Sequence, residues 1–227
     1  RRKVFDPSRR RPSMIDETIA EIREMQTHSS SVVAVKATRA LSELTEREHA
    51  TVEEFERDLE RNASALKRAN PSHASLFNAI QTVVVNVVDR KDTVEEAKSL
   101  LTEVIDRVVE DVQQGKSRAA DNAASIFEDG PTFLTHDFSS TVLEAVERAA
   151  GEGAELTAYV TEARPRFLGR KTARRFAEVD GVEPHLIVDG AAGTFLAECD
   201  RVVVGMDCIV EDTLYNRVGT YPIIATA

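Results

Sequence analysis

Residues 133–142 read FLTHDFSSTV, and this stretch predicts the fold of the second half of the chain. An apolar pair comes first, small polar residues follow, and the apolar residues at 142–146 then take helical spacing. A buried strand that leads through a polar turn into a helix is typical of the phosphate-binding turns of α/β folds. The turn nevertheless carries a carboxylate, Asp137, which opposes the binding of an anion.

The same order of strand, turn and helix repeats after Gly130. We predict strands at 132–134, 156–160, 185–188 and 201–204, and helices at 141–150, 169–179, 191–197 and from 216 onward. Short apolar strands that alternate with helices indicate a parallel sheet covered on both faces. Ligands of such sheets bind outside the carboxyl ends of the strands. The candidate positions are therefore 135–140, 162–166, 189–190 and 205–207.

Before residue 130 the chain has a helical pattern. Ile15, Ile19 and Ile22 recur at three- and four-residue intervals, and the helix-capping sequence TVEE occurs at Thr51 and again at Thr93. The first eleven residues instead combine six basic residues with Pro and Ser, without an apolar period. We predict a basic flexible arm or linker at 1–13, an α-helical domain at 14–128 and a Rossmann-like α/β domain at 129–227.

The composition excludes several classes of protein. Lys and Arg total 29 against 39 Asp and Glu, so the net charge is −10, and general nucleic-acid binding is not expected because it needs a basic face. No stretch approaches the roughly 20 apolar residues of a membrane span, and we expect a cytoplasmic protein. The acid-rich, lysine-poor composition fits a salt-rich cytoplasm, although acidic proteins are also common elsewhere. Cys199 and Cys208 are too few for a disulfide framework.

Three stretches of the second half resemble a known family. They read TEARPRFLGR at 161–170, LIVDGAAGTFL at 186–196 and VVVGMDCIVEDTLYNRVGTYPIIATA at 202–227. Their order and spacing are similar to the alpha/beta/delta family of translation initiation factor 2B, which also contains the ribose-1,5-bisphosphate isomerases and the methylthioribose-1-phosphate isomerases. The resemblance implies a dimer, of identical chains or of related subunits, formed through the α/β domain. Because the family pattern continues past the helix expected from 216, the resemblance also implies that the last strands of the sheet are missing here, so that the α/β domain is incomplete.

The resemblance implies a specific change in the chemistry of the turn. The isomerases of this family move protons with a cysteine in a T-H-C turn and an aspartate in a V-G-x-D strand end. The aspartate matches Asp207, whereas the cysteine position holds Asp137. A thiol with a pKa of about 8.5 keeps a proton at neutral pH, but a carboxyl group with a pKa of about 4 is ionised unless its surroundings raise that pKa.

The phosphate-binding positions also depart from the family pattern. Where the isomerases carry R-G-A and R-P-T, this chain has His28-Ser29-Ser30 and Asn70-Pro71-Ser72, so two guanidinium groups that would hold phosphate are absent. Arg217 keeps the charge of a family lysine, and one phosphate is expected to bind where a bisphosphate would be poorly neutralised. The expected ligand-binding residues are Ser139, Ser140, Arg164, Asn216, Arg217, His28 and Gly190.

Two functions from different classes follow. The leading hypothesis is a regulatory or binding protein, similar to initiation factor 2B subunits, that recognises a phosphorylated sugar or nucleotide without standard isomerase chemistry, cofactor or metal. The alternative is an aldose–ketose isomerase with Asp137 and Asp207 as catalytic residues, where repulsion raises the pKa of one carboxyl group. A third interpretation adds Asp189, so that three carboxylates hold Mg²⁺ under a phosphate. His136 is expected to serve the geometry of the turn.

Overall fold

The structure is a computed structural model that describes residues 13–26 and 29–227. The chain divides into two compact units, one ending at Val112 and the other beginning at Gln113, and each is described by itself. The division lies inside the long helix α6 (Val94–Ala124), whereas the sequence places the boundary after residue 128. Apart from Ser13, the basic arm predicted at 1–13 lies outside the described residues.

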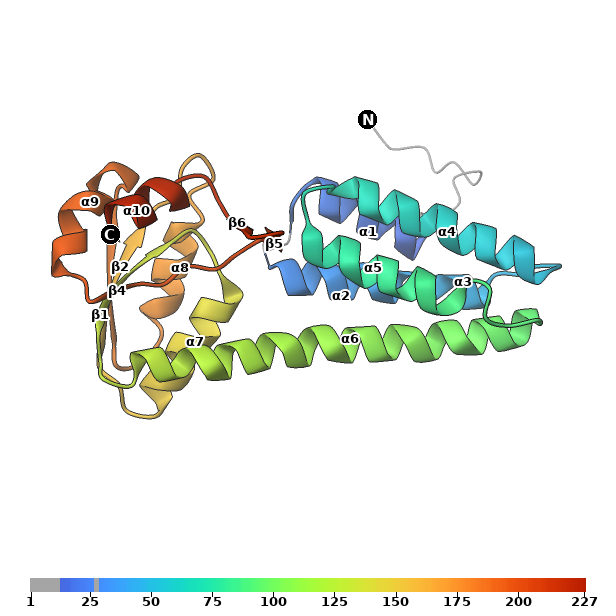
Figure 1. The fold of residues 1–227 in the computed structure, drawn as a ribbon, viewed down its shortest axis with the longest axis horizontal. Coiled ribbons are helices and arrows are strands. Elements are labelled where there is room, and N and C mark those ends of the chain that lie inside the picture. The colour runs from blue at the N-terminus through green and yellow to red at the C-terminus, as the bar shows by residue number, and fades with distance from the viewer. Residues whose placement is uncertain (1–12, 27–28) are drawn as a thin grey trace, which may run out of the picture. The chain divides into compact units, whose positions relative to one another are not determined.

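The first unit consists of helices packed around one apolar core (Figure 1). Its elements are α1 (Met14–Arg23), α2 (Ser30–Ala40), α3 (Glu43–Glu46), α4 (Val52–Ala69), α5 (Ala74–Val87) and the first part of α6. The α5 helix packs against α2 and α4, and α1 packs against the same two helices. The two predicted caps are confirmed, because the hydroxyl groups of Thr51 and Thr93 accept the amide hydrogens of Glu54 and Glu96, each at 3.3 Å.

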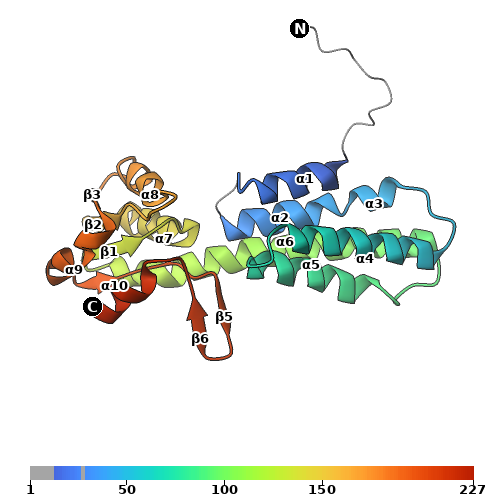
Figure 2. The same ribbon diagram turned by 90° about the horizontal axis from the view of Figure 1, so that it is seen from above.

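The second unit contains a parallel sheet in the order β3-β2-β1-β4 (Figure 2). Its strands are β1 (Thr132–His136), β2 (Leu156–Thr161), β3 (Val182–Ile187) and β4 (Arg201–Val202), and its helices are α7 (Ser140–Gly151), α8 (Gly169–Phe176), α9 (Ala192–Phe195) and α10 (Thr220–Thr226). Short 3-10 turns are η1 (Ser125–Phe127), η2 (Asp189–Ala191) and η3 (Leu196–Glu198).

Adjacent residues of β1 bury their side chains on opposite faces of this sheet. Phe133 belongs to a core shared with α7 and α8, whereas Leu134 belongs to a core shared with α9 and α10. This alternation follows from the two-residue period of a strand. It confirms the prediction of an α/β protein whose N-terminal helices precede a parallel sheet with helices on both faces. None of the helices in the described ranges is long and apolar enough to cross a membrane.

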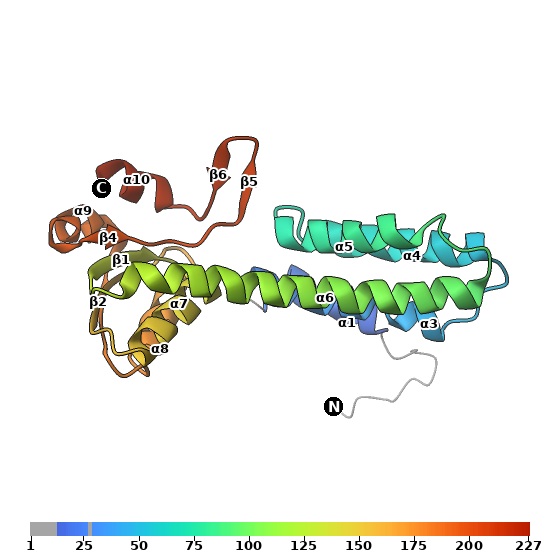
Figure 3. The ribbon, with the colours of Figure 1, turned by 60° about the horizontal axis from the view of Figure 1, so that its bottom comes forward.

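The last segment differs from the sequence prediction. Instead of a helix from 216, the chain forms an antiparallel hairpin of β5 (Cys208–Val210) and β6 (Thr213–Tyr215), and α10 begins only at Thr220. Gly219 has a φ of 107°, a left-handed conformation that ends any helical run before it. The hairpin extends away from the sheet of its unit (Figure 3). The third strand also begins earlier than predicted, at Val182, and the fourth is shorter.

Candidate active site

Asp137 lies in the turn that follows β1, at the carboxyl end of the central part of the sheet. Its backbone has a φ of 66°, which turns the chain sharply between β1 and α7. The hydroxyl group of Thr172 on α8 donates a hydrogen bond of 2.7 Å to the carbonyl oxygen of Asp137 and so anchors the turn. The side chain is 8% exposed. The predicted catalytic position is therefore a buried carboxylate at a strand end.

The structure brings Asp137 and Asp207 together through Arg217. The Nε atom of Arg217 lies 3.3 Å from Oδ2 of Asp137, and its Nη2 atom lies 3.4 Å from Oδ1 of Asp207. The side chains of Asp207 and Arg217 are 27% and 37% exposed, so both are more accessible than Asp137. One guanidinium group thus bridges the two carboxylates that the sequence singles out.

The surroundings of Asp137 raise the pKa of its carboxyl group. Burial is the main cause, because it removes water from the ionised form, and the negative charge of Asp207 adds a smaller effect. The positive charge of Arg217, that of His136 when protonated, and the amide of Phe138 oppose the rise in pKa. Repulsion between the carboxylates, which the sequence suggests as the cause, contributes less than burial.

His136 is buried and forms hydrogen bonds through both ring nitrogens. Its Nε2 atom lies 2.8 Å from the carbonyl oxygen of Val218, and its Nδ1 atom lies 2.6 Å from the hydroxyl group of Thr161. A carbonyl oxygen only accepts, so Nε2 donates the hydrogen bond to Val218. A Cβ atom on Gly219 would come within 2.7 Å of the same ring. His136 therefore holds the segment next to Arg217 against β1.

One serine and one glycine bring the segment after β4 close to the start of α7. The hydroxyl group of Ser139 accepts the amide hydrogen of Val142 at 3.3 Å and caps the helix that Ser140 begins. A Cβ atom on Gly205 would lie 2.6 Å from the Oγ atom of Ser139, so only glycine lets the segment after β4 approach this cap. Farther along the chain, the side-chain amide of Asn216 donates to the hydroxyl group of Thr220 at 3.1 Å.

Asp189 supports the loop after β2 instead of joining the other two carboxylates. Its Oδ1 and Oδ2 atoms accept the amide hydrogens of Ala163 and Arg164, each at 2.7 Å. Within the described residues no group of three His, Cys, Asp or Glu side chains could hold a metal ion, so the Mg²⁺ interpretation has no support. The Arg164 side chain is exposed over the ring of Phe167, and a Cβ atom on Gly190 would meet open space.

The remaining predicted positions are in the first unit or outside the described residues. His28, predicted to bind ligand, lies outside the part of the chain that the structure describes. Asn70 follows the last residue of α4, and its side chain accepts a hydrogen bond of 2.9 Å from the hydroxyl group of Ser72.

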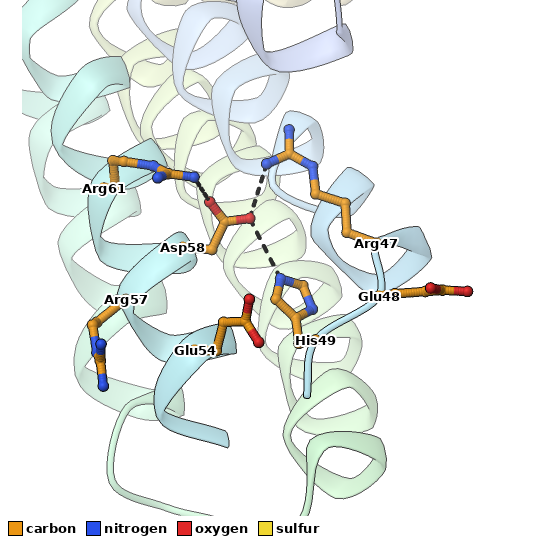
Figure 4. A pocket seen from close by; sticks show the side chains of 7 residues that line it. All are labelled: Arg47, Glu48, His49, Glu54, Arg57, Asp58 and Arg61. Carbon is orange, nitrogen blue, oxygen red and sulfur yellow. Dashed lines mark hydrogen bonds and ion pairs between the residues drawn. The ribbon is translucent and has the colours of Figure 1, made fainter. Parts of the chain in front are cut away.

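The first unit contains a second polar cluster, which the sequence patterns did not predict. Its pocket has a cavity volume of about 320 Å³ and lies between α4 and the segment before it (Figure 4). Asp58, at its centre, accepts hydrogen bonds from Arg47 at 2.9 Å, from Arg61 and from Asn62, and contacts His49 at 3.4 Å. An acid three residues after Phe55 in the apolar stripe of α4 is the signal that could have revealed it. Because protein side chains already occupy its oxygens, Asp58 is a structural anchor.

Comparisons with known proteins identify the family. The family described as "Initiation factor 2 subunit family" matches residues 26–227. The ribose 1,5-bisphosphate isomerase of Haloferax volcanii is 33% identical over 208 residues, covering 91% of this chain and 64% of that protein. A putative methylthioribose-1-phosphate isomerase of Archaeoglobus fulgidus is 29% identical over 192 residues, covering 80% of this chain and 56% of that protein.

A solved structure agrees with the sequence comparisons. The crystal structure of the translation initiation factor eIF-2B of Pyrococcus horikoshii superimposes with a TM-score of 0.82 and 26% identity, covering 95% of this chain and 74% of that chain. The chain thus spans less than two thirds of the length of both isomerases named above. Since the family match extends over nearly the whole sequence, this protein belongs to the initiation factor 2 subunit family.

Proposed function

We propose that this protein is an aldose–ketose isomerase that acts on a phosphorylated sugar, with Asp137 as the acid and Asp207 as the base. The supporting observation is that two carboxylates of unequal burial share Arg217 at neighbouring strand ends. A buried carboxyl group with a raised pKa is suited to donate a proton, and a more exposed carboxylate is suited to accept one. Relatives named as isomerases support this alternative over the leading hypothesis from the sequence, a protein without isomerase chemistry.

The proposed reaction moves two protons and one hydride equivalent. Asp137 protonates the ring oxygen of the sugar as its bond to C1 breaks. Asp207 takes the proton of the C2 hydroxyl group as that carbon becomes the ketone, while the hydrogen on C2 moves with its electron pair to C1. C1 is thereby reduced and C2 oxidised. Proton exchange with water then returns Asp137 to its protonated form and Asp207 to its ionised form. Arg217 is free to turn toward the phosphate, because its contacts among the described residues are two long ion pairs.

The test is an isomerisation assay of the full chain with ribose 1,5-bisphosphate and with methylthioribose-1-phosphate, the substrates in the names of the relatives. We expect turnover by the wild type and a loss of about 10²- to 10⁴-fold in kcat for Asp207→Asn and for Asp137→Asn. A thermal-shift measurement with each sugar shows separately whether the variants still bind. Binding by the wild type without any turnover would contradict the isomerase proposal.

A non-catalytic binding protein is the second candidate. The observation in its favour is that Arg217 pairs with both carboxylates, so their charge is neutralised in part. The same assay separates the two candidates. Stabilisation by a phosphorylated sugar or a nucleotide, with no turnover of any sugar, favours this candidate, and the search then moves to a protein partner.

A dimer of identical chains is part of the proposal. Apolar side chains are exposed on both faces of the β5–β6 hairpin, where Ile209 is 58% and Tyr215 is 52% exposed, and Val218 and Tyr221 beyond it are 86% and 83% exposed. Exposed apolar surface of this kind marks protein interfaces. Sedimentation equilibrium measures the mass directly, and we expect Tyr221→Lys with Val218→Lys to shift a dimer toward monomer. A wild-type monomer at all concentrations contradicts this part.

A further inference from the structure

Arg217 is the cation that compensates the buried charge of Asp137. Its ion pairs of 3.3 and 3.4 Å are longer than the roughly 2.7–2.9 Å of a charge-assisted hydrogen bond, so the guanidinium group has donors to spare. Its side chain is 37% exposed, whereas that of Asp137 is 8% exposed. A ligand that enters from solvent therefore reaches Arg217 more readily than it reaches Asp137.

A phosphate group competes with Asp137 for this guanidinium. It carries up to two negative charges and offers paired oxygens that match the fork of an arginine. As Arg217 turns toward the phosphate, Asp137 loses its cation and gains a negative neighbour in the same step. An ionised carboxylate that is buried without a partner is strongly disfavoured, and it becomes neutral by taking up a proton.

We propose that the binding of a phosphorylated ligand is coupled to protonation of Asp137, so that the phosphate takes over Arg217 and the carboxylate takes a proton from solvent. The coupling rests on the proposed function only in that an anion binds next to Arg217. A thiol at this position would be protonated at neutral pH because of its own higher pKa. Under the proposed coupling, the Asp137 carboxylate becomes protonated when the ligand binds and can then serve as the acid. The raised pKa of Asp137 in the ligand-free protein acts in the same direction.

Other charged groups near Asp137 define the controls. Asp207 contacts the Nη2 atom of Arg217, next to the Nε atom that contacts Asp137, and His136 precedes Asp137 on β1. On α8, Thr172 binds the carbonyl oxygen of Asp137, and the Nζ atom of Lys171 lies 4.2 Å from the centre of the Phe138 ring. Of these groups His136 and Asp207 could take a proton instead, so the experiment has to separate both from Asp137.

The test is calorimetric titration of the full chain with sulfate between about pH 5 and 7. Sulfate keeps a constant charge over this range, so any proton taken up on binding goes to the protein. Titrations in two buffers with different ionisation enthalpies give the number of protons taken up per bound sulfate. We expect uptake that approaches one proton in the wild type and none in Asp137→Asn, with His136→Gln like the wild type. By linkage, the affinity of the wild type for sulfate should rise by up to about tenfold per pH unit of acidification, and that of Asp137→Asn should change less.

Each outcome decides the proposal. Sulfate binding without proton uptake by the wild type overturns it, and so does uptake that persists in Asp137→Asn. Failure of sulfate to bind at all overturns it as well. An infrared band of a protonated carboxyl group that appears with sulfate in the wild type and not in Asp137→Asn supports it independently. Proton uptake with no turnover of any sugar would keep the coupling and reject the isomerase, so the two proposals fail separately.

Discussion

Asp137 combines a left-handed backbone with a buried charge. A φ of 66° is costly for most residues, but aspartate and asparagine tolerate it because their short side chains can bond locally. The turn therefore accepts a carboxylate without a change of fold, and burial then sets the protonation of that carboxylate. Asparagine has the same shape and the same backbone tolerance, so Asp137→Asn isolates the charge.

The free energy of unfolding should show this charge as a pH dependence. Because the pKa of Asp137 is raised in the folded protein, the folded state binds more protons than the unfolded state between the two pKa values. Its stabilising contribution is fully present below the unfolded pKa of about 4 and is lost as the pH rises through the folded pKa. In urea denaturation across this range, the free energy of unfolding of Asp137→Asn relative to that of the wild type should therefore increase as the pH rises. A difference that does not vary with pH would contradict the raised pKa.

His136 gives a second prediction for a single residue. His136→Ala leaves the carbonyl oxygen of Val218 and the hydroxyl group of Thr161 without their partner, and we expect a loss of about 1–3 kcal/mol in the free energy of unfolding. His136→Gln retains a donor that can reach the carbonyl oxygen and should recover part of the loss. Urea denaturation measures stability, and the affinity for sulfate shows whether Arg217 has moved. Equal affinities in all three proteins would mean that His136 does not position Arg217.

Among the elements, α4 is fixed to the segment before it by Asp58. Burial alone would raise the pKa of this carboxyl group, but the hydrogen bonds of Arg47 and His49 and the charges of Arg47 and Arg61 together hold the pKa below its usual value. The carboxylate thus ties the chain at Arg47 to the middle of α4. The position of α4 thus depends on a charged contact along the helix as well as on the Thr51 cap at its start.

Replacement of Asp58 should therefore destabilise the protein in a pH-dependent way. We expect Asp58→Asn to lower the free energy of unfolding by about 1–3 kcal/mol at neutral pH. Since the folded pKa is lowered, the contribution is present above the unfolded pKa of about 4 and is lost as the pH falls through the folded pKa. Glu60→Gln, at an exposed position of the same helix, is the control and should change stability by less than about 0.5 kcal/mol. Equal effects of the two substitutions in thermal denaturation would show that Asp58 is not a structural anchor.

At the scale of the whole molecule, the buried apolar residues form separate cores in the two units. One core runs from Ile15 to Val109, and the cores of the second unit use residues from Ala120 onward. Each unit thus buries apolar surface of its own, which is the property of a domain. The α6 helix contributes to a core in both units.

We expect this separation to appear in calorimetric unfolding as two transitions. Leu59→Ala should lower the midpoint of one transition and Phe133→Ala that of the other, with costs of about 2–5 kcal/mol each, because both side chains are fully buried. Val85→Ala, at an exposed apolar position, is the matched control for the first unit. A single transition that both core substitutions shift equally would show that the units unfold together.

The sequence by itself determined the order of helices, the parallel sheet and the turns at the carboxyl ends of its strands. These features depend on local periodicity and on short signals such as the TVEE caps, which involve only residues close together in the sequence. It also singled out Asp137, Asp207 and Arg217. It did not predict the β5–β6 hairpin, whose strands of three residues are too short for a periodic pattern.

Only the tertiary structure decided how these side chains meet. The Arg217 bridge joins residues 137, 207 and 217, the His136 contact reaches Val218, and both oxygens of Asp189 are used by the loop after β2. Such pairings depend on which strand ends lie side by side and on how deeply each group is buried. The pKa of a carboxyl group follows from that burial and from its charged neighbours in space, which the order of residues along the chain does not specify.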